Sequence, residues 1–341
     1  MLARLLCLAL SLTTPQDESP RVGLGPIAGY SSGSGLIGGA IVSLQWPRWL
    51  LSGELSASTK GAITFRPQLA YSAGGWGIVG ELVYEKQLEN DYYGLGNGGH
   101  PDTSATYDME QQEAEVLLSL SPAAGIQLGF GLAARHSVIF NRQESALWQQ
   151  SPSELTGSQL TAGPRLTADW SGQLGLPVRV TAGFLHQEGG DASYSRGRGQ
   201  LAAYLPLGPK TVLAARGRLT RHYGTSTTPF PYQLYLGSLQ GLRGYRDNRF
   251  SGDWSLLCSA ELRQEVLRLS APGEMPVAVG AVLFGDAGQV SSALKGLAMD
   301  RFHASGGLGL RLLLPGNMVL AVDAALSSEG FGLSTGYGQT F

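Results

Sequence analysis

Apolar residues alternate with polar or small residues along most of this chain, and the alternation predicts strands. Residues 125 to 135 are the clearest case, because isoleucine, leucine and phenylalanine there occupy every second position between glutamine, glycine and alanine. Residues 111 to 120 and 306 to 312 repeat the two-residue period. Successive side chains of a strand point to opposite faces, so each segment would have one apolar face. The pattern indicates an all-β protein.

The connections between these segments alternate between short and long. Short turns rich in glycine, proline and serine bound the apolar alternation, and a pair of strands fits between consecutive members of this series. The short turns are Trp46 to Arg48, Ser72 to Gly75, Ser121 to Gly125, Ser171 to Gly175, Pro206 to Lys210, Ala271 to Met275 and Pro315 to Asn317. The long polar connections are residues 87 to 106, 138 to 157, 223 to 253 and 287 to 301.

This sorting by length is typical of barrels in bacterial outer membranes, which have tight periplasmic turns and longer external loops. We therefore expect a transmembrane antiparallel β-barrel of about 16 strands, from near Pro26 to Phe341, with its apolar faces in contact with lipid. Both ends of the barrel domain would then face the periplasm. A soluble all-β sandwich or propeller, with apolar faces inward, is the alternative, and the 49 glycines among 341 residues suit both.

The first residues resemble an export signal. Arg4 supplies a positive charge, and a short apolar stretch from Leu5 to Leu12 follows it, as in a secretory signal peptide. We expect residues 1–18 to be a signal peptide and residues 19–341 to form the outer membrane β-barrel domain. Cleavage would leave Cys258 without a cysteine partner for a disulfide. The net charge of −2 indicates no nucleic-acid partner.

The long connection 223–253 contains an arginine in a glycine-flanked turn. Ordering such a loop inside a wide lumen costs backbone entropy, roughly 1 to 2 kcal/mol per residue, so the loop needs an anchor. The guanidinium of Arg243 can form a bidentate pair with Asp286 or Glu261 on later strands. We therefore expect loop 223–253 to fold into the lumen and to be held there by this pair.

The residues beside the arginine fit the same role. Gly244 would let the backbone turn tightly at the barrel wall, and Tyr245 could wedge against that wall. Strand parity is compatible with an inward Glu261, because Ser259 and Arg263 then share its face. The residues turned to lipid would be Leu256, Cys258, Ala260, Leu262 and Val266. An ordinary surface loop with a chance arginine is the alternative.

Residues 331 to 341 read as the last strand. Aromatic residues lie on one face of this strand, and the last of them is the terminal residue Phe341. Such residues are typical of the membrane interface. They also resemble the C-terminal signal that barrel-assembly machinery recognises, and Tyr337 and Phe341 would form that signal. Three glycines thin this strand, which is compatible with weak pairing to the first strand: Gly332, Gly336 and Gly338.

Four segments together resemble the bacterial surface antigen superfamily, which includes BamA, TamA and the two-partner secretion transporters. Leu242-Arg-Gly-Tyr245 is similar to its arginine-glycine-aromatic loop motif, and Phe284-Gly-Asp-Ala-Gly288 is similar to its aromatic-x-Asp-x-Gly strand motif. Ser259-Ala-Glu-Leu-Arg263 resembles the acid-bearing strand between them, and Tyr92 to Asn97 resembles an external-loop signature. Gly288 enters the expected anchor site through this resemblance, and the loop motif falls between the eleventh and twelfth expected strands.

The resemblance implies a role in outer membrane protein assembly, insertion or translocation. It implies as partners the outer membrane lipids, the barrel-assembly machinery for insertion of the chain itself, and a polypeptide substrate or periplasmic partner. The best-known relatives carry polypeptide-transport-associated domains before the barrel, and we expect a short form that lacks them. A non-enzymatic outer membrane pore or surface structural protein is the alternative function.

Other patterns do not indicate an enzyme, a cofactor or a metal. Gly29 to Gly33 matches the hydrolase string G-x-S-x-G but lies in a turn between strands, away from any strand-to-helix elbow. Gly94 to Gly99 matches the dinucleotide string G-x-G-x-x-G, but no helix is expected after it. The five histidines lack the spacing of zinc ligands. We expect no catalytic residues, no cofactor and no metal, and an outer membrane hydrolase is the enzymatic alternative.

Overall fold

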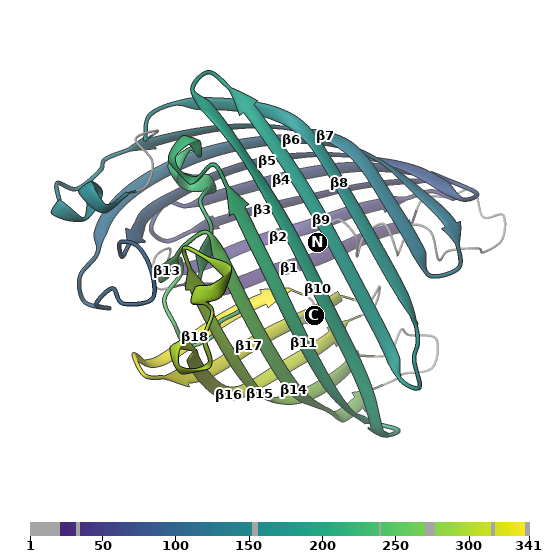
Figure 1. Cartoon of the computed structure of the whole chain (residues 1–341). Helices are drawn as coiled ribbons and strands as arrows, with labels where there is room; N and C mark the ends of the chain where they lie inside the picture. Colours follow the sequence, from purple (N-terminus) through teal and green to yellow (C-terminus); the bar gives the residue numbers. More distant parts are fainter. Residues whose placement is uncertain are drawn as a thin grey trace.

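The computed structural model describes residues 21–31, 35–151, 156–238, 240–269, 277–314 and 318–337. Sixteen strands form one antiparallel sheet in which each strand pairs with the next along the chain, and Figure 1 shows this sheet curling into a barrel. The strands are β1 (Arg21–Ser31), β2 (Gly35–Gln45), β3 (Trp49–Ser58), β4 (Ile63–Ala73), β5 (Trp76–Tyr92), β6 (Ala105–Ala123), β7 (Ile126–Phe140), β8 (Gln159–Gln173), β9 (Pro177–Gly189), β10 (Ala192–Gly208), β11 (Thr211–Tyr223), β14 (Trp254–Leu269), β15 (Val277–Ser291), β16 (His303–Leu314), β17 (Met318–Ser327) and β18 (Gly330–Tyr337). The connections contain the short pair β12 (Tyr235–Leu236) and β13 (Phe250–Ser251), and the 3₁₀ turns η1 (Ala146–Gln150), η2 (Thr225–Thr227), η3 (Phe230–Tyr232), η4 (Leu294–Gly296) and η5 (Met299–Arg301).

The predicted barrel and its order of strands are confirmed. The predicted short turns lie between strands that pair with each other, and those at 271–275 and 315–317 lie outside the described residues. The strand limits differ most at the predicted connection 87–106, because β5 continues to Tyr92 and β6 begins at Ala105. Beyond the hydrocarbon layer a strand needs only backbone pairing, so polar sequence there does not mark its end.

Side-chain exposure alternates as a lipid-facing barrel requires. On β6 and β7, the large apolar side chains of Val116, Phe130 and Leu132 are exposed, with Leu132 at 68%. Ser119 and Ala133, which have the opposite parity on the same strands, are buried. A soluble sandwich or propeller would bury the large apolar set, so the soluble alternative is wrong.

Aromatic residues cluster at the end of the barrel where the short turns lie. Trp49 on β3, Tyr71 on β4 and Trp76 on β5 are neighbours, with ring centroids 4.7 Å and 5.5 Å apart along this series. Both tryptophans are exposed. Such rings suit the boundary between lipid and water, which agrees with a membrane-spanning wall between the two sets of connections.

The first and last strands lie next to each other, so the two edges of the sheet meet. A Cβ atom built on Gly29 of β1 would lie 3.7 Å from the Cβ atom of Thr335 on β18. Among the described residues, no helix is long and apolar enough to cross a membrane.

Two predictions concern residues outside the described part of the chain. The expected signal peptide, residues 1–18, and the terminal Phe341 are not among the described residues. Tyr337 ends β18, where its backbone pairs with Leu320 of β17. The signal peptide and the C-terminal signal therefore stay predictions.

Cys258 gives a direct test of which strand face contacts lipid. It is free and exposed on β14, whereas the adjacent Ser259 is 5% exposed. We expect a bimane label on Cys258 in liposomes to be quenched by spin-labelled lipid more strongly than by aqueous iodide. The same label on a Ser259→Cys variant in a Cys258→Ser background is the control, and it should show the opposite order. Equal quenching at both positions would contradict the assigned faces.

Candidate functional site

The connection between β11 and β14, residues 224–253, carries the predicted anchor. It leaves β11 through Gly224, whose φ of 75° lies in the left-handed region that favours glycine. After two 3₁₀ turns, Leu236 of β12 pairs with Phe250 of β13. The pairing of β12 with β13 brings together the two ends of the segment between them, which contains Arg243. This segment forms the tip of the connection.

The structure brings Arg243 together with both predicted acids. Its Nε and Nη2 atoms lie 2.7 Å and 3.0 Å from the two carboxylate oxygens of Asp286, which makes a bidentate pair. Its Nη1 atom lies 2.8 Å from Oε1 of Glu261. The three residues are at most 3% exposed. Each ionic hydrogen bond is therefore shielded from competition by water.

Three further charged residues extend this cluster. Nη1 of Arg243 also lies 3.2 Å from Oδ2 of Asp323 on β17. Arg311 on β16 approaches Asp323 with an Nη1 to Oδ1 distance of 2.6 Å, and Arg263 on β14 approaches Glu261 at 2.7 Å. With Asp286 included, three carboxylates meet three guanidiniums. The buried cluster is electrically balanced, as burial of charge requires.

Sequence reasoning missed Asp323 and assigned no partner to Arg311. Asp323 is the sole charged residue of β17, whose other residues are mostly valine, alanine and leucine. A lone carboxylate in an apolar strand is costly to bury unless it is paired. The position of Asp323 as the one charged residue in an apolar strand could therefore have predicted a buried ion pair.

Phe284, which begins the predicted strand motif, also contacts the arginine. The guanidinium carbon of Arg243 lies 3.5 Å from the centre of the Phe284 ring, so the ring covers one face of the cation. Burial alone would lower the pKa of Arg243, but its hydrogen bond to Asp286 and the nearby carboxylates raise that pKa above the usual arginine value. Arg243 therefore stays charged.

Gly244 lies where the tip of the connection approaches the wall. Its φ of 85° is in the left-handed region, and a Cβ atom there would lie 3.1 Å from Cβ of Ala325 on β17. Ser327 donates a hydrogen bond of 2.8 Å to its carbonyl oxygen. Gly332 of β18 faces it, since a Cβ atom on Gly332 would lie 3.0 Å from Cα of Gly244. The two glycines allow the two backbones to meet.

Tyr245 and Gly288 belong to an apolar cluster beside the charges. The Tyr245 ring is buried against Leu236, Leu242, Phe250, Leu257 and Val290. Its hydroxyl donates to the carbonyl oxygen of Ala304 at 3.1 Å. A Cβ atom on Gly288 would lie 2.9 Å from Cδ2 of Leu236, so glycine at this position makes room for the cluster.

The connection 224–253 also contacts the external-loop signature, residues 92 to 97. The backbone N–H of Gly96 donates to the carbonyl oxygen of Ser251 at 2.8 Å, and the Ser251 hydroxyl donates to the carbonyl oxygen of Gly94 at 2.9 Å. Arg249 forms a 2.8 Å ion pair with Glu329, between β17 and β18. Burial raises the pKa of Tyr93 to about 12, so its hydroxyl stays neutral.

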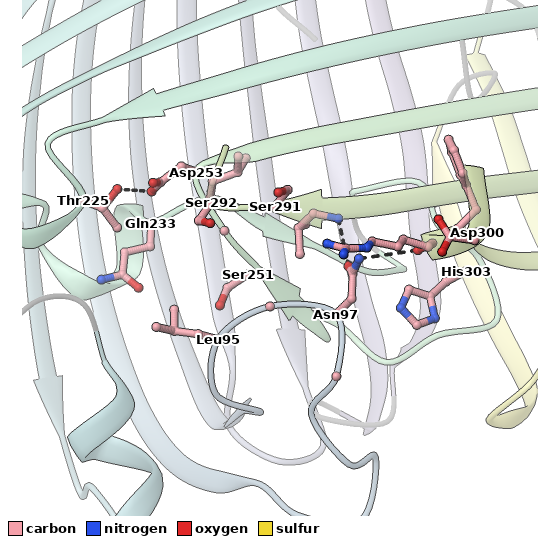
Figure 2. Close-up of a pocket in the computed structure, with 17 residues that line it drawn as sticks. Leu95, Asn97, Thr225, Gln233, Ser251, Asp253, Ser291, Ser292, Asp300 and His303 are labelled. Atoms are coloured by element: carbon pink, nitrogen blue, oxygen red, sulfur yellow. Dashed lines mark hydrogen bonds between the residues drawn. The ribbon is translucent and has the colours of Figure 1, made fainter. Parts of the chain in front are cut away.

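A cavity of about 740 Å³ lies among three of the long connections. Figure 2 shows Asn97, Ser251, Asp253 and His303 around it. The side chain of Asn97 accepts a hydrogen bond from the backbone N–H of Val290 at 2.9 Å and thereby ties the first of these connections to β15. In the part of the chain that the structure describes, no group of three or more histidine, cysteine or acidic residues could hold a metal ion.

Comparison with solved structures relates the fold to known barrels. BamA from Haemophilus ducreyi lacking POTRA domains 1-3 is 17% identical with a TM-score of 0.61, and the match covers 95% of this chain and 70% of that one. CdiB from Acinetobacter baumannii is 15% identical with a TM-score of 0.61, covering 95% and 60%. CdiB from Escherichia coli is 14% identical with a TM-score of 0.65, covering 95% and 63%. The chain spans less than two thirds of the length of both CdiB chains, and at these identities the likeness shows the fold.

The family is shown by the sequence itself. Residues 102–341 match the model of the Omp85 superfamily domain, a range that includes Arg243 and strands β14 to β18. No curated protein matches the chain significantly. The predicted resemblance to the superfamily of BamA is thereby confirmed, and with it the location in the bacterial outer membrane. The chain belongs to the Omp85 superfamily.

Proposed function

We propose that this barrel acts in the assembly, insertion or translocation of proteins at the outer membrane. In this proposal the connection 224–253 is folded into the lumen and anchored by Arg243 to Asp286 and Glu261. The observation that carries the proposal is the buried cluster in which a guanidinium from a long connection completes the pairing of carboxylates on three wall strands.

The energetics of the cluster support an anchored connection. Removing one partner of a buried ion pair costs about 3 to 5 kcal/mol, because the remaining charge is left uncompensated. Asp286 has Arg243 as its sole ion-pair partner among the described residues. Withdrawal of the connection would therefore leave a buried carboxylate unpaired, and the anchored state is favoured strongly.

The contacts of the connection 224–253 with neighbouring loops are those expected of a segment that gates the lumen. The Gly96 bridge to Ser251 and the ion pair of Arg249 with Glu329 join the connection to both sides of the barrel mouth. A connection held at its tip by Arg243 and at its base by these contacts would narrow the lumen. We infer that a client chain would either displace it or pass beside it, at the seam between β1 and β18.

Membership of the superfamily also supports proposals for export, for insertion and for a client. We propose that residues 1–18 direct export, that the barrel-assembly machinery inserts the chain, and that a polypeptide substrate or a periplasmic protein meets the barrel. We infer no enzymatic role, as the superfamily is one of assembly and transport proteins.

Reconstitution tests the assembly role. We expect liposomes containing the barrel to accelerate the folding of a second, urea-unfolded outer membrane barrel several-fold over empty liposomes, measured by its heat-modifiable mobility in gels. Planar-bilayer conductance is recorded on the same preparation. Conductance with an unchanged client folding rate would instead favour the pore alternative.

A disulfide across the seam sharpens this test. The Gly29→Cys and Thr335→Cys pair, in a Cys258→Ser background, has the required Cβ separation of 3.7 Å. If clients enter through the seam, the oxidised form should fold them at the rate of empty liposomes, and reduction should restore the acceleration. Equal activity of the oxidised and reduced forms would exclude lateral opening.

A further inference from the structure

Strands β10 and β11 carry an unusual charge pattern. Together they hold five arginines and neither aspartate nor glutamate. In the printed sequence, no acidic residue occurs between Asp191 and Asp247. The arginines of the two strands are Arg196, Arg198, Arg216, Arg218 and Arg221.

Four of these five arginines lie on the inner face. Arg196 and Arg198 share the parity of Ala202, which is 1% exposed, and have the parity opposite to the lipid-exposed Leu201. On β11, Arg216 and Arg218 share the parity of the fully buried Ala214. The register pairs Gln200 with Arg218 and Arg198 with Thr220, so the cations are diagonal neighbours on one patch of wall.

The fifth arginine points the other way. Arg221 lies on the outer face of β11, with its guanidinium 4.6 Å from the ring centre of Tyr223 and 4.9 Å from that of Trp254. Asp253 lies 3.8 Å from it. Arg221 is thus a matched control: the same residue on the same strand, outside the lumen.

Arginines elsewhere on the inner wall have carboxylate partners. Arg66 pairs with Glu85 at 2.9 Å, Arg165 with Glu115 at 2.7 Å and Arg179 with Asp169 at 2.7 Å. Strands β4 to β9 hold more acidic than basic residues. Strands β10 and β11 differ from these strands, because they carry arginines and no acidic residue.

Three of the inner arginines of β10 and β11 donate hydrogen bonds to neutral groups. Arg196 donates to the carbonyl oxygen of Gln233 at 3.1 Å, and Arg218 donates to that of Gln240. Arg216 donates to the hydroxyl of Ser259 at 3.0 Å. Carbonyl and hydroxyl oxygens satisfy the N–H donors but do not cancel the charge. Arg216 lies near the carboxylates of Asp286 and Glu261, whereas Arg196, Arg198 and Arg218 form no ion pair among the described residues.

Arg198 is the free member of the patch. It is exposed although it lies on the inner face, and among the described residues it has neither an ion pair nor a hydrogen bond. The charged group that acts on it is another cation, Arg165. Arg218 likewise has Arg198 and Arg216 as its charged neighbours. A guanidinium fork in this state matches the oxygens of an oxyanion.

We propose that the inner face of β10 and β11 is an anion-binding surface of the lumen, which takes a small oxyanion with several negative charges. Arg198 and Arg218 supply the guanidinium forks, and Arg196 adds to the positive field. This surface lies beside the balanced cluster around Arg243, because β11 pairs with β14. It does not depend on whether the barrel moves polypeptides.

Calorimetric titration of the detergent-solubilised protein with inorganic tripolyphosphate at low salt tests this proposal. We expect saturable binding, weakened roughly tenfold by Arg198→Gln and partly restored by Arg198→Lys. Arg221→Gln should leave the affinity within about twofold, because its side chain is outside the lumen. Among the described residues, no hydrogen bond or ion pair joins Arg198 to the connection 224–253, so the substitution should leave that connection in place. Absence of saturable binding, or equal weakening by Arg198→Gln and Arg221→Gln, would overturn the proposal.

Ion selectivity gives a second, independent measurement. Under a potassium chloride gradient across a planar bilayer, the wild-type barrel should show a reversal potential of the anion-selective sign. Arg198→Glu should shift it toward cation selectivity, and Arg221→Glu should shift it much less. A cation-selective wild type would count against an anion-binding wall.

Discussion

Replacing Arg243 with alanine is expected to produce the largest change of any single substitution in this barrel. The variant would leave Asp286 buried without its ion-pair partner, and Glu261 and Asp323 would each lose one partner. The expected cost is about 3 to 5 kcal/mol in the free energy of unfolding, the range for breaking a buried ion pair. Urea unfolding in detergent micelles, followed by tryptophan fluorescence, measures it.

The same substitution should change conduction. Loss of the anchor would release the connection 224–253, so single-channel currents in planar bilayers should become larger or noisier. Arg243→Lys should be intermediate, because an ammonium keeps the charge but cannot form the bidentate pair.

Arg246→Ala is the matched control for Arg243. Arg246 belongs to the same connection but is exposed, where it donates to the carbonyl oxygen of Pro101 at 3.1 Å. Its loss should change stability by less than about 1 kcal/mol. An Arg243→Ala protein with wild-type stability and conductance would refute the anchor.

Gly332→Val is expected to have the second largest effect. A Cβ atom at this position of β18 would lie 3.0 Å from Cα of Gly244 and 3.4 Å from its carbonyl carbon. Because backbone cannot yield as a flexible side chain can, the valine should push the tip of the connection away from the wall. We expect a loss of about 1 to 3 kcal/mol from overpacking, together with the noisy conductance of an unanchored connection.

Gly336→Val tests whether that effect is specific. Gly336 is on the same strand and has the same parity, but a Cβ atom there would meet nothing within 4 Å. The control should behave like the wild type in unfolding and conductance. Similar behaviour of both variants would mean that valine acts through the strand and not through contact with Gly244.

Gly332 and Gly336 look alike in the sequence, which predicts only that both thin the last strand. In the structure, Gly332 faces Gly244 and Gly336 faces open space. A glycine in a sequence shows that a side chain is absent, but not which neighbouring residue occupies the space. Here that neighbour, Gly244, lies 88 positions earlier in the sequence.

The period of two and the sorting of turns by length were enough to establish the all-β class, the strand order and the lipid-facing set, because side-chain direction in a strand follows from local geometry. Local motifs likewise identified Arg243, Glu261 and Asp286 as partners. The inclusion of Asp323 and Arg311 in the cluster, and the placement of the acid-free, arginine-rich strands β10 and β11 side by side on the wall, were decided by the tertiary structure. Strand register and barrel curvature set the height and the neighbours of each inward side chain, and these depend on residues far apart in the chain.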